Sequence, residues 1–378
     1  MKKFSHNDNY FVPPGVLNSS QLRRLRKAGV IGSPNNIKAE GSAFDLHLGA
    51  HGWRLSGSIK QIDHADKSVE EVCNKHGNAF RIDKKGIVLE KGHVAVIELQ
   101  ERVDFRQHPW LIGEATGKSS IGRLDILTRL LVDQCPQYER VPAKYAGPLY
   151  IEIAPISFNV RLYRGDSLNQ LRIHCGLLNE MDTLVGRRLL FDSDDGTAFS
   201  SEAQQNRTLS LDLSPTGDKR LVAYVLRRGN LKDFDFKQKY RIDPADYFEP
   251  VVKKDRSLTI KVDRFYILRS IERLALPRDV AVTGMAYSET LGELRIHYAG
   301  FAHPWFGMQR KDKKTGAPLI FEVRAHNFPI VLRHKEVLAT IRFYKMSEEI
   351  PRVELKEAAY SKQELQLSSY FRQRTDWP

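Results

Sequence analysis

The sequence predicts a mainly β protein built from two tandem sandwich or barrel domains with a few short helices. The first observation is length, because 378 residues exceed what one ordinary hydrophobic core holds. The second is a series of short alternating apolar and polar stretches separated by turns, which is typical of all-β domains. The third is an internal repeat, in which residues 148–172 match residues 318–342 at a constant shift of 170 without a gap.

The first predicted element is a helix over residues 18–31. Ser19 or Ser20 is the expected N-cap, because a side-chain oxygen there can accept a hydrogen bond from the first turn. Apolar residues follow at helical spacing, and Gly29 is expected to end the helix.

Strand patterns dominate the rest of the first half. The predicted strands are residues 42–49, which end in glycine, 87–97, which are two strands around a turn at 91–92, 103–113, 149–153 and 158–162. Residues 103–113 are expected to lead directly into the polar stretch 117–123.

These patterns divide the chain into four parts. Residues 1–175 form the first predicted domain and residues 206–346 the second. Residues 176–205 are charged and lose the strand rhythm, so they are predicted to be a linker. The polar tail, residues 347–378, is predicted to form a helix and an extended end.

The repeat shows that the two domains are copies of one unit. Seven pairs of identical residues share the shift: Pro148/Pro318, Leu149/Leu319, Glu152/Glu322, Phe158/Phe328, Leu162/Leu332, Leu168/Leu338 and Arg172/Arg342. Apolar alternation agrees at most other positions, which chance does not produce over such a length between unrelated β segments.

Residues 117–123, Gly-Lys-Ser-Ser-Ile-Gly-Arg, are the strongest candidate for a ligand site; we name them the serine loop. Lys118 and Arg123 suit phosphate oxygens. Ser119 and Ser120 offer hydroxyl and backbone N–H groups, and glycine allows close backbone approach. The order differs from the Walker pattern. On its own, the stretch is weak evidence for a site, because a polar turn with solvated charges has the same composition.

The second copy supplies an internal comparison for this loop. Three replacements separate the copies: Lys118 to Ser288, Ser119 to Glu289 and Arg123 to Glu293. Acidic side chains repel phosphate at contact distance. A polyphosphate site is therefore expected in the first copy only.

A glutamate occupies the same mid-strand position in both copies, Glu152 and Glu322. A carboxylate among apolar strand residues either faces solvent or is buried. Burial raises its pKa and makes it a usable general base or acid near neutral pH. Both readings stay open from the alternation alone.

Together these residues resemble the dCTP deaminase family of the dUTPase-like superfamily. The serine loop is similar to the family motif Gly-Arg-Ser-Ser-x-x-Arg, and residues 41–49 resemble its Gly-x-x-x-Asp-x-x-Leu-Gly segment. Residues 20–31 resemble the family's first helix, and Glu152 falls on the strand that carries its catalytic glutamate. Residues 369–373 resemble the C-terminal Tyr-x-x-Gln segment that closes over the nucleotide. The match covers nearly the whole chain in the double-length bacterial form.

The resemblance implies two tandem dUTPase-like β-barrel (distorted jelly-roll) domains that deaminate dCTP to dUTP and ammonia in pyrimidine deoxynucleotide metabolism. It implies that a glutamate takes a proton from water, that hydroxide attacks C4 of cytosine, and that the glutamate returns the proton to N3 and then to ammonia. Ser119 and Arg123 would orient the water and stabilise charge. Lys118 and Ser120 would hold phosphate oxygens.

The superfamily builds each site between neighbouring subunits, which implies a composite site here. The first copy would give the serine loop and the second a hairpin at residues 297–307. The base would be Glu152 or Glu322, and Glu152 is favoured. Further expected nucleotide contacts are Asp133, Tyr298, Ala299 and Gln373.

The chain departs from the family pattern in three places. Lys118 replaces the usual arginine, and residues 134–147 are longer than the family's hairpin. His303 stands in the second hairpin where an aspartate is expected. The sugar contact is therefore not assigned.

No protein-bound metal is expected. The sequence lacks the His-x-Glu and Pro-Cys-x-x-Cys pairing of zinc deaminases, and Cys73, Cys135 and Cys175 have no metal-ligand or redox spacing. The resemblance implies Mg²⁺ as the cofactor, bound mostly through the substrate triphosphate.

The remaining expectations concern partners and rival functions. The net charge of +13 favours an anionic partner, but the basic residues are interleaved with acids, so a small nucleotide such as dCTP or dUTP is favoured over nucleic acid. No apolar run of about 18 residues predicts a membrane span, and the N-terminus lacks a secretory pattern, so a cytoplasmic protein is expected. The family implies a homo-oligomer, typically a trimer. Alternatives are a dUTPase with water held by Asp133, a bifunctional deaminase and dUTPase, or a non-catalytic nucleotide-binding regulator.

Overall fold

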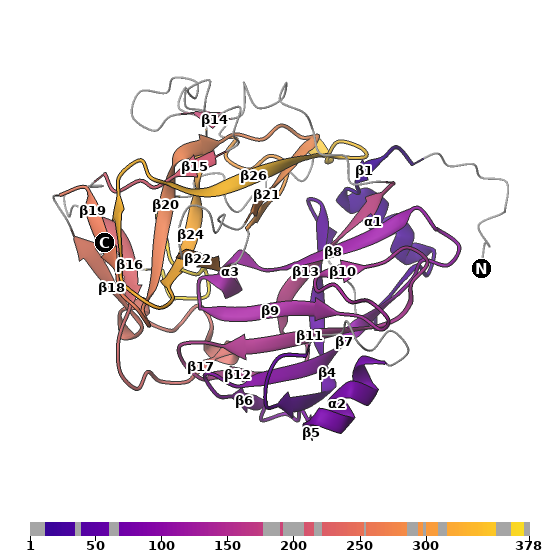
Figure 1. The fold of residues 1–378 in the computed structure, drawn as a ribbon. Coiled ribbons are helices and arrows are strands. Elements are labelled where there is room, and N and C mark those ends of the chain that lie inside the picture. The colour runs from indigo at the N-terminus through magenta and orange to yellow at the C-terminus, as the bar shows by residue number, and fades with distance from the viewer. Residues whose placement is uncertain are drawn as a thin grey trace.

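The structure, a computed structural model, describes residues 12–34, 39–59, 68–176, 190–191, 208–214, 221–252, 255–285, 294–297, 300–308, 316–352 and 364–373. It is mainly β, as the sequence predicts. The two halves of the chain form two β units that lie side by side, indigo to magenta and orange to yellow in Figure 1. Among the described residues, no helix is long and apolar enough to cross a membrane.

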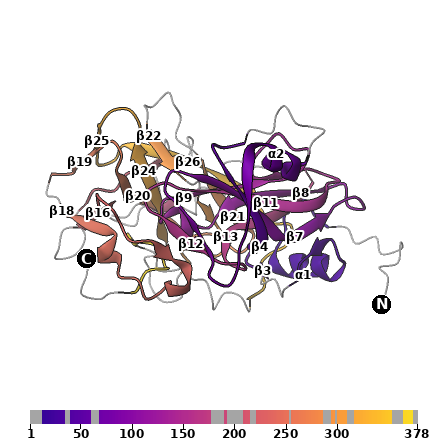
Figure 2. The same ribbon diagram turned by 90° about the horizontal axis from the view of Figure 1, so that it is seen from below.

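The first unit is built on one large sheet in the order β10-β8-β13-β4-β7-β11-β9, with β1, β2, β3 and β5 paired to it. Its elements are β1 (Gly15–Val16), α1 (Ser19–Lys27), β2 (Ile31–Gly32), β3 (Ala39–Glu40), β4 (Ala43–Leu55), α2 (Val69–His76), β5 (Gly77–Arg81), β6 (Ile87–Leu89), β7 (Val94–Asp104), β8 (Leu111–Gly117), α3 (Ser119–Gly122), β9 (Ile126–Leu131), β10 (Arg140–Val141), β11 (Ala146–Pro155), β12 (Val160–Leu162) and β13 (Ser167–Cys175). In Figure 2, α1 and α2 lie on opposite sides of these strands.

The second unit contains the sheets β18-β16-β20-β24-β22, β15-β26-β21-β23 and β19-β25. Its elements are β14 (Leu190–Phe191), β15 (Thr208–Ser210), β16 (Leu221–Leu226), β17 (Phe234–Asp235), η3 (Phe236–Gln238), η4 (Pro244–Asp246), β18 (Phe248–Val252), β19 (Ser257–Ile260), β20 (Phe265–Leu274), β21 (Val280–Met285), β22 (Leu294–His297), β23 (Phe301–Ala302), β24 (Ala317–Ala325), β25 (Ile330–Arg333) and β26 (Val337–Lys345).

The internal repeat is visible in three successive strands of each unit. A shift of 170 residues carries β11, β12 and β13 onto β24, β25 and β26 to within one residue at each end. Glu152 on β11 and Glu322 on β24 are therefore equivalent in structure as well as in sequence.

The predicted first helix is present as α1, but its cap differs from the prediction. Asn18 caps it: the side chain of Asn18 accepts the Gln21 backbone N–H at 3.0 Å, and the Asn18 N–H donates to the Gln21 side chain at 2.9 Å. This reciprocal pair is a capping box, so Ser19 and Ser20 lie inside the helix. Gly29, with φ of +80°, follows the helix end as expected.

Most predicted strands of the first half are confirmed, with two errors of extent. β4 runs through Gly49 to Leu55, because Gly49 lies close to the Glu98 backbone and does not turn. Residues 103–113 are not one strand: β7 ends at Asp104 and β8 begins at Leu111 after a turn. The side chain and backbone N–H groups of Arg106 donate to Asp104 in that turn.

The two units share buried apolar surface. The main core of the first unit also includes second-half residues, among them Phe234, Tyr247, Phe371 and Ile267. A second core lies between the sheets of the second unit. Strand β17 of the second half pairs in parallel with β12 of the first, which ties the units by backbone hydrogen bonds too.

Two predicted segments fall largely outside the described residues. Only Gly176 and β14 are described from the predicted linker 176–205. In the tail, residues 347–352 and 364–373 are described, and residues 364–373 are extended with turns.

Candidate active site

The serine loop lies at the boundary between the two units, where Figure 1 shows α3. It begins as β8 ends, and α3 supplies a single helical turn from Ser119 to Gly122. The backbone N–H of Lys118 donates to the carbonyl of Leu168 on β13, 2.9 Å away. The loop is therefore anchored on the sheet of the first unit while its other side faces the second unit.

The ammonium group of Lys118 is bound to a carboxylate of the same unit. Its Nζ lies 2.6 Å from Oδ2 of Asp45, and both side chains are partly exposed. Asp45 belongs to the segment 41–49 that resembles the family's second motif. A phosphate group reaching Lys118 would share this cation with Asp45.

Glu322 enters the site from β24 of the second unit. Its carboxylate lies so close to the backbone of α3 that a Cβ added at Gly122 would overlap it. Glycine at position 122 thus permits the approach of a side chain from the other half of the chain. The side chain is buried, and within the described residues its Oε2 has no hydrogen-bond partner.

The environment of Glu322 favours its protonated form. Burial raises the pKa of the carboxyl group well above its ordinary value, the guanidinium of Arg123 lowers it, and the carboxylate of Asp125 raises it again. A buried carboxyl group with a raised pKa and an oxygen without a hydrogen-bond partner has the properties of a general acid and base.

Arg123 follows α3 directly and is also buried. Its guanidinium donates to the carbonyls of Gln366 and Leu367 in the tail, at 3.3 and 3.5 Å. Arg123 thus faces both the Glu322 carboxylate and the C-terminal segment.

The C-terminal segment packs over the serine loop. The Ser368 hydroxyl donates to the carbonyl oxygen of Ser120 at 2.6 Å, and the Tyr370 ring lies beside Ser120 and Lys118. Phe371 is buried in an aromatic cluster with Phe234 and other second-half rings. Gln373, the expected nucleotide contact, is exposed beyond this anchor.

Glu152 occupies a different environment from Glu322. Its carboxylate accepts hydrogen bonds from the Ser58 hydroxyl at 2.8 and 3.0 Å and from the Ile59 N–H at 3.2 Å. Arg129 lies 3.7 Å away. None of these partners belongs to the serine loop or to the second unit. Within one chain, the structure brings Glu322 and not the favoured Glu152 to the loop, because docking of the units, which repeated strands do not specify, decides the contact.

Asp133 is also held away from the loop. Its Oδ1 accepts the backbone N–H of Val69 at the start of α2, 2.7 Å away. Burial raises the pKa of Asp133. Tyr298 and Ala299, the other expected contacts, lie outside the described residues.

His303, in the expected aspartate position of the second hairpin, reaches the first unit. Its Nδ1 lies 3.1 Å from the Ser42 hydroxyl, in the segment that also carries Asp45. Burial, together with the positive charge of Arg172, lowers the pKa of His303 to about 4. The ring is therefore neutral at physiological pH and offers one donor and one acceptor in place of a carboxylate.

Sequence reasoning missed the interdomain ion pair between Asp125 and Arg324. Asp125 lies two residues after Arg123, and Arg324 lies two residues after Glu322. A comparison of the two copies could have drawn attention to the pair, because the shift of 170 aligns Asp125 with Arg295 and Arg324 with Ala154. These positions differ between copies in charge, as the loop positions do.

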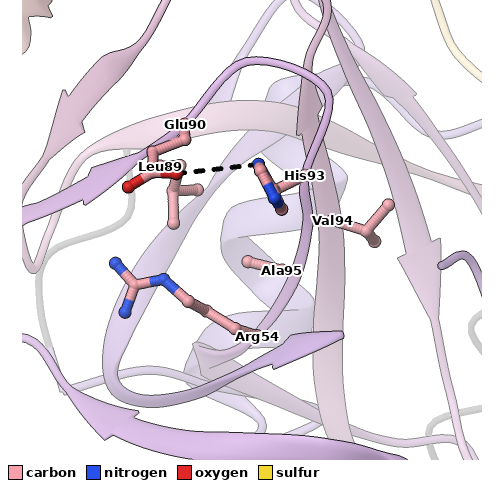
Figure 3. Close-up of a pocket in the computed structure, with 6 residues that line it drawn as sticks. All are labelled: Arg54, Leu89, Glu90, His93, Val94 and Ala95. Atoms are coloured by element: carbon pink, nitrogen blue, oxygen red, sulfur yellow. Dashed lines mark ion pairs between the residues drawn. The ribbon is translucent and has the colours of Figure 1, made fainter. Parts of the chain in front are cut away.

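The described residues contain no group of three or more His, Cys, Asp or Glu side chains that could hold a metal ion. Cys73, Cys135 and Cys175 are free and buried. A surface pocket of about 180 Å³, lined by residues around Arg54 and the exposed Glu90–His93 pair, is shown in Figure 3. It lies near β6, away from α3 in Figure 1, and neither the serine loop nor Glu322 lines it.

Comparison with known proteins gives concordant matches for both halves. The family model described as the 2'-deoxycytidine 5'-triphosphate deaminase (DCD) N-terminal domain matches residues 13–177, and that of the C-terminal domain matches residues 179–371. The chain is similar to the crystal structure of 2'-deoxycytidine 5'-triphosphate deaminase from Agrobacterium tumefaciens, with a TM-score of 0.81 and 29% sequence identity. That match covers 92% of this chain and 99% of the other. No curated protein matches the chain.

Proposed function

Because the chain belongs to the 2'-deoxycytidine 5'-triphosphate deaminase family, we propose that it hydrolyses dCTP to dUTP and ammonia in deoxynucleotide metabolism. The observation that carries this is the Glu322 carboxylate, which is buried against the serine loop of the other half and whose Oε2 has no hydrogen-bond partner among the described residues. The loop offers cations for a triphosphate, and the carboxyl group offers proton transfer. Both are what a deamination without a protein-bound metal requires.

In the proposed reaction Glu322, in its ionised form, removes a proton from water. The hydroxide adds to C4 of cytosine, and Glu322 gives the proton to N3. Glu322 then takes the proton of the new C4 hydroxyl and gives it to the amino group, the C4–N bond breaks, ammonia leaves, and the C4 carbonyl of dUTP remains. Because burial raises the pKa of Glu322, its carboxylate is a stronger base than an ordinary glutamate.

The other site residues take roles that fit their positions. Arg123 faces Glu322 and would stabilise the negative charge that develops on the adding oxygen. Ser119 would orient the water, while Lys118 and Ser120 would hold phosphate oxygens. Mg²⁺, carried by the triphosphate, would neutralise part of its charge.

Exchange of each glutamate for glutamine tests the proposal. Ammonia release from dCTP should fall by about 10²–10⁴-fold in Glu322→Gln, the usual contribution of a general base. Glu152→Gln should stay within a few-fold of wild type, because that carboxylate is saturated by hydrogen bonds far from the loop. Full activity in Glu322→Gln would overturn the mechanism. Assays of pyrophosphate from dUTP, run in parallel, report any dUTPase activity.

We also propose that the chain self-associates in the cytoplasm, as its resemblance implies, and that the partner is a second copy. In the first unit Phe158 is 2% exposed, covered by Phe234 and Tyr247, and β12 is paired by β17. The equivalent Phe328 is 54% exposed, and within the described residues the equivalent β25 pairs with β19 alone. A strand edge without a partner strand, beside exposed apolar residues, is typical of a surface that binds another chain.

Mass measurement by light scattering tests this surface. The wild-type chain should be an oligomer, a trimer if the family arrangement holds. Phe328→Glu should shift it toward monomer, whereas the same change at the exposed Trp110 should not. A monomeric wild type, or a Phe328→Glu variant of unchanged mass, would contradict this assignment of the surface.

A further inference from the structure

The ion pair between Asp125 and Arg324 joins the two units beside the proposed site. Asp125 lies two residues after Arg123 of the serine loop, and Arg324 lies two residues after Glu322. Arg324 Nε lies 3.2 Å from Oδ1 of Asp125, and a terminal nitrogen of the same guanidinium contacts Oδ2. The hydroxyl of Ser157 bonds to both side chains. Asp125 is 0% exposed. Such a two-pronged arginine–carboxylate contact fixes orientation as well as distance.

The backbone of Asp125 is held on both sides. Its N–H donates to the carbonyl of Gly122 at 2.8 Å, and its carbonyl accepts from Ile156 at 3.0 Å. Its φ of +58° lies in the left-handed region, which aspartate tolerates better than most residues. Asp125 is thus a fixed point on the loop that carries Gly122 and Arg123.

Arg324 is equally well fixed to Glu322. Side chains at positions i and i+2 of a strand point to the same face, so both residues of β24 face the first unit. The guanidinium also lies over the ring of Phe265 on β20, 5.7 Å from its centroid. The loop and the strand that meet at the Glu322–Gly122 contact therefore meet a second time at the ion pair.

Comparison of the two copies shows that the ion pair can form only between the loop of the first copy and the strand of the second. A second-copy loop against a first-copy strand would place Arg295 at the position of Asp125 and Ala154 at that of Arg324. That arrangement offers no complementary charge. The pair therefore favours docking of the first-copy loop on the second-copy strand, the arrangement that contains Glu322.

We propose that the Asp125–Arg324 ion pair is a positioning device that seats the Glu322 carboxylate against the serine loop. This inference rests on the proposed deaminase function. Neither residue is required to touch substrate, and the expected consequence of removing the pair is a loss of kcat without a matching rise in KM. The phosphate-binding cations of the loop belong to the first copy and remain in place.

Three variants test the proposal by ammonia release from dCTP. Asp125→Asn/Arg324→Met removes both charges, so neither is left unpaired, and asparagine tolerates the left-handed backbone. Its kcat should fall by about 10²-fold, the usual effect of a misplacement of about 1 Å, with KM within a few-fold of wild type. Arg324→Lys, which keeps the charge but not the fork, should fall between the double variant and wild type. Glu90→Gln/His93→Gln, which removes the exposed pair of Figure 3, is the control and should stay at wild-type kcat.

The outcomes separate the inference from the function on which it rests. If wild type releases no ammonia from dCTP, the proposed function fails. If wild type is active and the folded double variant keeps wild-type kcat, only the positioning role fails. A double variant whose KM rises while kcat is unchanged also overturns it. Circular dichroism melting of each variant confirms that the folded protein is being assayed.

Discussion

Gly122→Ala is the smallest change that should separate the two halves of the proposed site. Gly122 is helical and has no positive φ, so alanine is compatible with its backbone. The added methyl group would overlap the Glu322 carboxylate, whose Cδ and Oε1 lie 2.9 Å from the position of the new Cβ. The perturbation is therefore steric and aimed at one contact.

The size of the effect follows from these distances. Ordinary contacts of a Cβ begin at 3.4 Å, so Cδ and Oε1 must retreat by about 0.5 Å, from 2.9 to 3.4 Å, and Oε2, the nearest of the three atoms, must retreat further. Overpacking of this kind costs about 1–3 kcal/mol, and the helix preference of alanine over glycine returns about 0.5–1 kcal/mol. We expect a net loss of about 1 kcal/mol in the free energy of unfolding. The displaced carboxylate should lower kcat by about 10²-fold.

The assay is ammonia release from dCTP, with thermal melting of the same samples. Gly57→Ala is the matched control, because a Cβ there meets nothing within 4 Å. It should match wild type in both measurements. The reasoning is refuted if Gly122→Ala retains wild-type kcat. A second check is the double variant Gly122→Ala/Glu322→Ala, in which the methyl group has space. Gly122→Ala should melt below wild type, whereas the double variant should melt no lower than Glu322→Ala.

Two further predictions concern pH and charge. Because the folded-state pKa of Glu322 lies above its ordinary 4.5, the stability it contributes is complete below that value and is lost as pH rises through the folded pKa. Glu322→Gln should therefore melt at the wild-type temperature near pH 4 and above it at alkaline pH, while wild-type kcat rises with a midpoint above 4.5; a midpoint at the ordinary value contradicts the assignment. Lys118→Ser, which copies Ser288 of the second half, should raise KM for dCTP by about 10–100-fold, the loss of one charged hydrogen bond, and leave kcat nearly unchanged. Lys118→Arg should keep the wild-type KM, and an unchanged KM in Lys118→Ser would remove Lys118 from the phosphate site.

Local patterns carried most of the fold. The alternation and the shift of 170 identify β11–β13 and β24–β26 because pleat periodicity is a property of neighbouring residues. Gly29 ended α1 as expected, for the same reason. The errors arose where a tertiary contact overrode a local signal. Gly49 reads as a strand end, yet it lies within β4 because the neighbouring strand approaches its backbone closely.

The site was only partly predictable, because half of it depends on docking. The serine loop is contiguous in sequence, so its cations and hydroxyls could be named. Glu152 and Glu322 have the same local pattern, and only the packing of the second unit on the first distinguishes them. The contacts of Asp125 with Arg324 and of Ser120 with Ser368 join residues 199 and 248 positions apart, beyond any local signal.

The two glutamates show how a duplicated unit can divide the work of one site. Each keeps the carboxylate at the same strand position, but Glu152 is bound by Ser58, Ile59 and Arg129, whereas Oε2 of Glu322 has no hydrogen-bond partner in the part of the chain that the structure describes. Burial of the Glu322 carboxyl group, with no donor to its Oε2 among the described residues, favours the protonated form. The second loop, which has lost its cations, needs no such base beside it. The cations of the first-copy loop and the Glu322 carboxyl group on β24 of the second copy therefore belong to one intrachain site. The ion pair between Asp125 and Arg324 joins this loop to this strand, and the opposite pairing of the copies offers no such pair.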